Sequence, residues 1–460
     1  MSVPDAVPGS YSEQFARFVV SARFEDLSPA GIGKIKSCII DQLGVQLIGS
    51  TLPWTRIVYD YARNIGGDGP CTIVGTTTRL SAPEAAFVNA TFGHGCEFDD
   101  IGHAGVAVIP AALAVAEEVN ATGREFLTTV ALGYEIFFRL FDAVMPQILE
   151  RGFHQQVVLG VFASAAVAGR LLHLPEEQLV HAFGIAGSHA SATAEYDQSG
   201  GEVKRMHAGL GARGGVQSAL LAHLGLTGPR QIFEGKRGIF RTFVDYVREQ
   251  GIAADLGKKF VFENSIALKI YPTVASIHTS IEALGQLIDK YQIRPEDVRQ
   301  IRVGIREYTL LHGAAIVVPS DVLGAQFSLA FSLALRLVMG RNDLDLYLNE
   351  KLWTDEDIVR VSRKVTAYAD PKAMHERIAG SLVSVEMNDG RIIEQYIQYR
   401  KGTSQNPATK VQLKEKFVSL AGSVLEHPQI EEVVGIVERL EHVGSVRSLA
   451  ALLGRAAKNS

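Results

Sequence analysis

The stretch His94-Gly-Cys-Glu-Phe-Asp-Asp-Ile-Gly-His103 places three carboxylates and two imidazoles within ten residues. Apolar residues with helical spacing precede it at 85–88 and follow it at 106–116. Ionisable groups between two apolar helices are costly to bury unless they pair, bind a ligand or transfer protons. The stretch therefore predicts a polar junction between two buried helices, and the nature of that junction decides how the chain is interpreted.

Three interpretations of this junction are open. A metal site would use His94, Glu97, one of the two aspartates and His103, all of which are acceptable ligand types. A general acid–base site would use a histidine that the carboxylates orient. In the third interpretation, Asp99 and Asp100 only cap the helix that follows. The rest of the chain must decide among them.

Length and composition describe an ordinary globular protein. A chain of 460 residues exceeds the size at which a single core usually stops growing, so two domains are expected. Hydrophobic residues make up 47% and charged residues 21% of the chain. The net charge of −5 argues against nucleic acid or an anionic membrane as the main partner. No apolar run reaches the length of a membrane span.

Cysteine usage and the N-terminal residues predict a cytoplasmic protein. Cys38, Cys71 and Cys96 have unrelated spacings, which predict neither a disulfide framework nor a paired-cysteine metal site. Such usage is typical of a reducing compartment. The N-terminal residues lack a basic region followed by an apolar block, so no signal peptide is expected.

The first 250 residues show repeated helix-start signals. Three pairs have the capping-box spacing before an apolar run: Ser10 with Glu13, Ser81 with Glu84, and Thr122 with Glu125. The segments 104–119 and 157–171 are rich in Ala, Val and Gly and have little polar face. Such helices belong in the middle of a helical bundle rather than on its surface.

The pattern changes near residue 260. Alternating apolar residues predict strands at 266–271 and 301–306, and 381–400 reads as a β-hairpin around Asn388-Asp389-Gly390. Helical patterns lie between them at 273–290 and 323–339, and helix returns after 405. The sequence thus predicts a mainly α fold. A large all-helical domain spans 1–267 plus 405–460, and a smaller, lid-like α+β domain is inserted at 268–404.

Further candidate residues lie outside the first stretch. His154 precedes an apolar helix, whose dipole disfavours the protonated imidazole and suits a neutral base. Lys204, Arg205 and His207 follow a glycine pair and begin another helix, which is a plausible anion pocket. Lys269 has apolar neighbours on both sides, so its ammonium group needs a partner or a ligand.

Taken in order, these segments resemble the MmgE/PrpD family, whose members include 2-methylcitrate dehydratase, cis-aconitate decarboxylase and iminodisuccinate epimerase. The matching segments are 87–89, 94–100, His103 with 108–110, 152–154, 204–209, and 269–272 with His278. The resemblance covers essentially the whole chain. It implies an all-helical domain with an inserted α+β domain, a site in the cleft between them, no cofactor and a homodimer. It also implies proton transfer next to a carboxylate, with loss of water, loss of carbon dioxide or inversion as the outcome.

Carried over position by position, the resemblance places the family's active-site set at Glu97, His103, His154, Lys204 and Lys269. Together with the neighbouring candidates, we expect the catalytic residues to be His103, His154, Glu97, Asp99 and Asp100. We expect a small anionic di- or tricarboxylate to be bound by Lys204, Lys269, Arg205, His207 and Tyr271. In this scheme the two histidines are the acid–base pair, the carboxylates tune His103, and no metal takes part.

Four positions depart from the family pattern. Glu97 stands where the family usually has Asp, Ile101 where it often has Thr or Ser, and Ala104 where it has Pro. Phe331 stands where the decarboxylase has a tyrosine. Losing hydroxyl groups removes hydrogen-bond partners for a substrate, which weighs against cis-aconitate and 2-methylcitrate specifically. Dehydration ranks first, decarboxylation second and epimerisation third. A metal-dependent hydro-lyase and a non-catalytic carboxylate binder are the alternatives.

Overall fold

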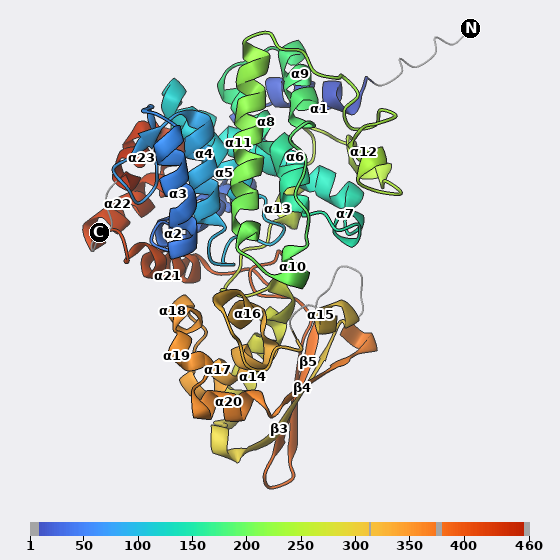
Figure 1. The fold of residues 1–460 in the computed structure, drawn as a ribbon, viewed down its shortest axis with the longest axis vertical. Helices are drawn as coiled ribbons and strands as arrows, with labels where there is room; N and C mark the ends of the chain where they lie inside the picture. The colour runs from blue at the N-terminus through green and yellow to red at the C-terminus, as the bar shows by residue number, and fades with distance from the viewer. Residues whose placement is uncertain (1–8, 312–313, 374–379, 455–460) are drawn as a thin grey trace. The chain divides into compact units, whose positions relative to one another are not determined.

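The computed structural model describes residues 9–311, 314–373 and 380–454, and these residues form two compact units (Figure 1). The first unit contains the described residues up to Gly95, then Gly102–Ile266, and the chain from Thr409 onward. The second unit contains Cys96–Ile101 and Ala267–Ala408. The sequence placed 96–101 in the all-helical domain, whereas this loop groups with the second unit. The ten-residue stretch is therefore divided between the two units.

In the described residues of the first unit, the regular secondary structure is helical apart from one short pair of strands. Its longer helices are α1 (Tyr11–Ser21), α2 (Pro29–Gly49), α3 (Pro53–Ile65), α4 (Ala82–Gly93), α5 (Gly105–Val119), α6 (Gly123–Val144), α8 (Gln155–Leu171), α9 (Glu176–Ala186), α11 (Val203–His223), α21 (Lys410–Ala421) and α22 (His427–Glu438). Its shorter helices are α7 (Gln147–Glu150), α10 (Tyr196–Ser199), α12 (Ile239–Thr242), α13 (Phe262–Ser265) and α23 (Arg447–Leu453). The strands β1 (Cys71–Thr72) and β2 (Arg79–Leu80) pair antiparallel. The mainly α fold predicted from the sequence is confirmed.

Two of the three predicted capping boxes are present in the structure. Ser10 and Thr122 each accept the predicted hydrogen bond and begin α1 and α6. Ser81 is the N-cap of α4, but its side chain makes no capping bond. The Glu84 carboxylate lies 2.6 Å from the Arg213 guanidinium on α11, so a tertiary ion pair replaces the predicted local bond.

Helix α11 packs closely against both α8 and α4, because small residues line its contact faces. A Cβ atom added at Gly215 would lie 2.4 Å from the Ser164 Cβ, and one added at Gly209 would lie 2.5 Å from the Phe87 carbonyl oxygen. Both distances are shorter than real Cβ contacts allow. The close packing holds α11 against α8 and α4 and so sets the positions of the residues at their ends. Among the described residues, no helix has the length and hydrophobicity that a bilayer crossing requires.

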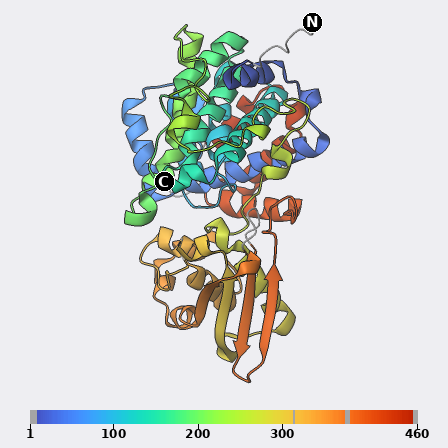
Figure 2. The same cartoon turned by 90° about the vertical axis from the view of Figure 1, so that its right-hand side faces the viewer.

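The second unit combines a four-stranded sheet with helices. Its helices are α14 (His278–Tyr291), α15 (Glu307–Leu311), α16 (Val322–Phe327), α17 (Leu329–Met339), α18 (Leu344–Leu348), α19 (Glu350–Trp353) and α20 (Glu356–Ser362). Its strands are β3 (Val298–Ile305), β4 (Val365–Ala369), β5 (Ser381–Met387) and β6 (Ile392–Ile397). They lie side by side in the order β4-β3-β5-β6 (Figure 2), with β3 and β4 parallel and the other pairs antiparallel. One apolar core packs between this sheet and α14 and α17.

Two predictions in this unit are confirmed and two need correction. The strand near 301–306 is β3, and the hairpin at 381–400 is β5 with β6. The predicted strand at 266–271 is wrong. Residues 266–269 are buried but form no strand. The Leu268 N–H donates a hydrogen bond to the Gly402 carbonyl oxygen instead of pairing within a sheet. The predicted helix at 323–339 is divided at Ser328, which caps α17. The alternation was misleading because both of its sets of residues, Ile266 with Leu268 and Ala267 with Lys269, are buried.

Candidate active site

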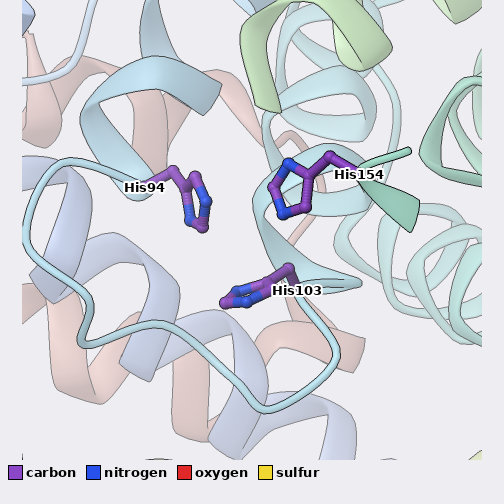
Figure 3. A group of neighbouring side chains, drawn as sticks. All are labelled: His94, His103 and His154. Carbon is purple, nitrogen blue, oxygen red and sulfur yellow. The ribbon is translucent and has the colours of Figure 1, made fainter. Parts of the chain in front are cut away.

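Three histidines of the first unit converge at helix ends. His94 ends α4, His103 lies directly before the N-cap of α5, and His154 is the N-cap of α8. One ring nitrogen from each lies within 4.8 Å of the other two, and the rings face one another (Figure 3). His94 and His154 are buried, whereas His103 is partly exposed. The cluster therefore offers three proton-carrying groups beside one another.

The three rings of this cluster lie close together and are tilted by different angles relative to one another. The ring centroids of His94 and His103 are 4.7 Å apart and nearly perpendicular. The His154 ring centroid lies 6.0 Å from each of them. Ring nitrogens within 4.8 Å of one another can pass a proton through one bridging water. This arrangement suits proton transfer.

Backbone conformation at two loop positions is unusual. His103 has φ of 65° and Glu97 has φ of 51°, both in the left-handed region that few residues other than glycine adopt. Such conformations cost about 1–3 kcal/mol each and persist where the surrounding structure imposes them. The backbone at both ends of this loop is therefore set by tertiary contacts. Asp99 and Asp100 do not cap α5, because its N-cap is Ala104 and no side chain bonds there.

Arg205 holds the chain directly after His94. Its Nε donates to the Gly95 carbonyl oxygen at 3.1 Å, and the indole N–H of Trp54 donates to the same oxygen at 2.8 Å. The Arg205 guanidinium also stacks 4.4 Å from the Trp54 ring centroid and pairs with Glu202 at 3.3 Å. These contacts fix the end of α4. The substrate-binding role of Arg205 stays a prediction.

The start of α11 brings Lys204 and His207 beside His154. The Nδ1 atoms of His154 and His207 are 3.0 Å apart, so one ring donates a hydrogen bond to the other. Burial, and after it the charges of His94 and Lys204, lower the pKa of His207 to about 4. Lys204 is buried, with its Nζ 5.9 Å from the Tyr196 ring centroid. His207 is therefore a neutral ring at physiological pH.

The segment around residue 193 supports His154 from the other side. The His154 N–H donates to the Ala192 carbonyl at 2.9 Å, and Phe153 and Thr193 form an isolated antiparallel bridge. Tyr196, a few residues on, lies edge-on to His154 at 5.4 Å between ring centroids. Sequence reasoning missed Tyr196, since a lone tyrosine after a Ser- and Ala-rich turn carries no signal. It named His94 only as a metal ligand.

The second unit contains the other predicted site residues. Lys269 Nζ donates to the carboxylate and to the backbone carbonyl of Glu97, each at 3.0 Å. Both side chains are buried, as are Asp99 and Asp100. Burial lowers the pKa of Lys269, while the nearby charges of Asp99, Cys96 and Asp100 oppose that shift. Glu97 therefore contacts Lys269 directly, and Asp99 and Asp100 are near enough for their charges to act on it.

Tyr271 and Phe331 also belong to this unit. Tyr271 is partly buried and edge-on to His278, at 5.3 Å between ring centroids, and burial raises the pKa of its phenol to about 12. Phe331 is fully buried in the apolar core, where its ring contacts Tyr347. A hydroxyl at position 331 would thus enter a core of apolar side chains.

The residues that could bind a metal ion differ from those that the sequence suggested. Within the described residues, the group able to hold a metal ion is His94, His103 and His154. The sequence had proposed Glu97 in place of His154, but Glu97 is paired with Lys269. Three imidazoles are ligands that zinc and related ions accept. The same nitrogens are the ones that an acid–base mechanism would use.

Comparisons with known proteins match the chain along most of its length. The MmgE/PrpD N-terminal domain model matches residues 13–250, and the MmgE/PrpD C-terminal domain model matches residues 271–442. A cis-aconitate decarboxylase-like protein, oryM, of Aspergillus oryzae is 27% identical over 98% of this chain and 99% of its own length. The cis-aconitate decarboxylase of Aspergillus terreus is 25% identical, covering 93% of each chain. That of Homo sapiens is 25% identical over 96% of this chain and 94% of its own.

Proposed function

The chain belongs to the MmgE/PrpD family, and from this premise we propose that it is a lyase that acts on a small di- or tricarboxylate. The relatives named cis-aconitate decarboxylase favour loss of carbon dioxide as the outcome. Sequence reasoning ranked dehydration first, and these relatives move decarboxylation ahead of it. The observation that carries the proposal is the convergence of His94, His103 and His154 at three helix ends.

The proposed chemistry needs a group that delivers or removes a proton beside a carboxylate. In a decarboxylation of an unsaturated acid, the C–C bond to the leaving carboxylate breaks and its electron pair shifts the adjacent double bond. A protonated imidazole then gives its proton to the far carbon of that double bond and regains one from water. We assign this exchange to His103 and His154, because His103 is partly exposed and His154 is buried beside it.

Substrate carboxylates need positive charge. Helix α5 begins two residues after His103, and α8 begins directly after His154. Helix α11 begins at Val203, so Lys204 lies in its first turn. Helix starts carry partial positive charge that favours anions. Lys204 adds a full cationic charge at one of these starts. We propose that Lys204 and Lys269 neutralise substrate carboxylates, and that Glu97, Asp99 and Asp100 hold Lys269 charged in its buried position.

Proton NMR in deuterated water tests the function directly. The purified protein would be incubated with a panel of unsaturated, hydroxy- and imino-polycarboxylates that includes cis-aconitate. A shortened acid with deuterium at one carbon supports decarboxylation, a new alkene signal supports dehydration, and α-deuterium with inversion supports epimerisation. If carboxylates bind but no compound changes and no proton exchanges, the protein is a carboxylate binder and the lyase proposal is wrong.

A further inference from the structure

We propose that His207 positions His154 and sets its tautomer, rather than contacting the substrate. The inference rests on the proposed function, in which His154 transfers a proton. It reassigns a residue that the sequence grouped with the substrate-binding side chains. Its basis is the direct contact between the two rings: their Nδ1 atoms are 3.0 Å apart, within hydrogen-bond distance.

Both partners of this contact are constrained. His207 is 3% exposed and His154 is 2% exposed. His207 lies one turn into α11, and the Gly209 and Gly215 contacts leave that helix little room to move. The His154 backbone is held by its N–H bond to Ala192. The two rings are therefore presented to each other by rigid elements, which is what a positioning residue requires.

The chemistry follows from the identity of the atoms. A neutral imidazole has one donor nitrogen and one acceptor nitrogen. When His154 carries two protons, its Nδ1–H must donate, and His207 accepts through its own Nδ1. That bond occupies Nδ1 of His154 and leaves Nε2 for the substrate. His207 accepts through an unprotonated Nδ1, and the 3.0 Å separation of the two Nδ1 atoms places that nitrogen within reach of the Nδ1–H of His154.

Other charged and titratable groups surround the pair. From the neighbouring elements these are His94 at the end of α4, His103 before α5, Tyr196 in α10, and Lys204 in α11 itself. Two of the effects on His207, from His94 and Lys204, oppose its protonation.

Two substitutions at His207 separate positioning from substrate binding. His207→Asn keeps a hydrogen-bonding atom near the place of Nδ1, whereas His207→Leu removes it. We expect His207→Leu to lower kcat by about 10- to 100-fold with little change in KM, and His207→Asn to recover most of that loss. His223→Asn, at the exposed end of the same helix, is the matched control and should leave kcat unchanged.

A second readout does not depend on turnover. In protein labelled with ¹⁵N-histidine, the Nδ1 signal of His154 should move in His207→Leu and stay near its original position in His207→Asn. A shifted signal supports the pairing even if no panel compound reacts, so failure of the proposed function is recognised separately. An unmoved His154 signal, or a raised KM with kcat intact, would overturn the positioning role. Both variants are compared by circular dichroism to confirm that they fold.

Discussion

The Lys269 ammonium group donates to two oxygens of a single residue, the carboxylate and the backbone carbonyl of Glu97, each at 3.0 Å. Glu97 itself has a left-handed backbone, with φ of 51°. In this conformation, the backbone carbonyl and the side-chain carboxylate of Glu97 both accept hydrogen bonds from the same ammonium group. The loop that contains Glu97 and the buried Lys269 ammonium group therefore hold each other in position.

Breaking this pair on one side should destabilise the protein. Glu97→Gln removes the carboxylate that lies 3.0 Å from the buried ammonium group, and we expect the free energy of unfolding to fall by about 3 kcal/mol. This is the low end for a broken buried pair, because the charges of Asp99 and Asp100 remain nearby. Replacing both partners, as in Glu97→Gln with Lys269→Met, should cost less than the sum of the two single changes. Urea unfolding of the four proteins measures this coupling. Strictly additive losses would contradict a direct interaction.

Lys269 should also matter for turnover. Because its charge is proposed to neutralise a substrate carboxylate, Lys269→Ala should reduce kcat/KM by about 100-fold or more. Lys372→Ala, at an exposed position in the same unit, serves as a control for the loss of a lysine. Steady-state rates with the reactive panel compound decide the matter. Full activity in Lys269→Ala would remove Lys269 from the proposed site.

His103 can be tested without disturbing its backbone. Asparagine tolerates the left-handed conformation better than most residues, so His103→Asn should keep the loop in place at φ near 65°. We expect kcat to fall by about 10²- to 10⁴-fold, while the melting temperature changes little. Activity and thermal unfolding are measured on the same preparation. A large loss of stability together with activity would point to a structural role.

Metal removal separates the acid–base mechanism from the metal-dependent alternative. The cluster of His94, His103 and His154 could serve either one. We expect dialysis against a chelator to leave kcat unchanged, because the imidazoles themselves carry the proton. Elemental analysis before and after dialysis shows whether any ion was present. Loss of activity on chelation, restored by one added divalent ion, would favour the metal-dependent hydro-lyase.

The pH dependence of stability should report on His207. Its pKa falls from an ordinary 6.5 to about 4 in the folded protein, so folding favours the neutral ring. This contribution is fully present above pH 6.5 and is lost as the pH falls towards 4, a loss of about 3 kcal/mol. His207→Asn should lack this component. Urea unfolding of both proteins at pH 7.5, 5.5 and 4.5 gives the difference, and parallel curves would contradict it.

Local signals were sufficient for much of the fold. The caps at Ser10 and Thr122 and the hairpin at 381–400 depend on neighbours a few residues away, so they could be read from the chain itself. The failures at 266–271 and Ser81 have the opposite cause. There, contacts with distant residues such as Gly402 replace the local bonds that the pattern suggested.

The mainly α class and the set of ionisable residues between His94 and His103 could be predicted without the structure, because periodicity, capping and composition are properties of short segments. The tertiary structure determines which distant residues the members of this set contact. His94 and His103 join His154, whereas Glu97 joins Lys269, which lies 172 residues further along the chain. No local pattern encodes such pairings, since the partners are far apart in the sequence and meet only in the folded chain, where Glu97 and His103 also have left-handed backbone.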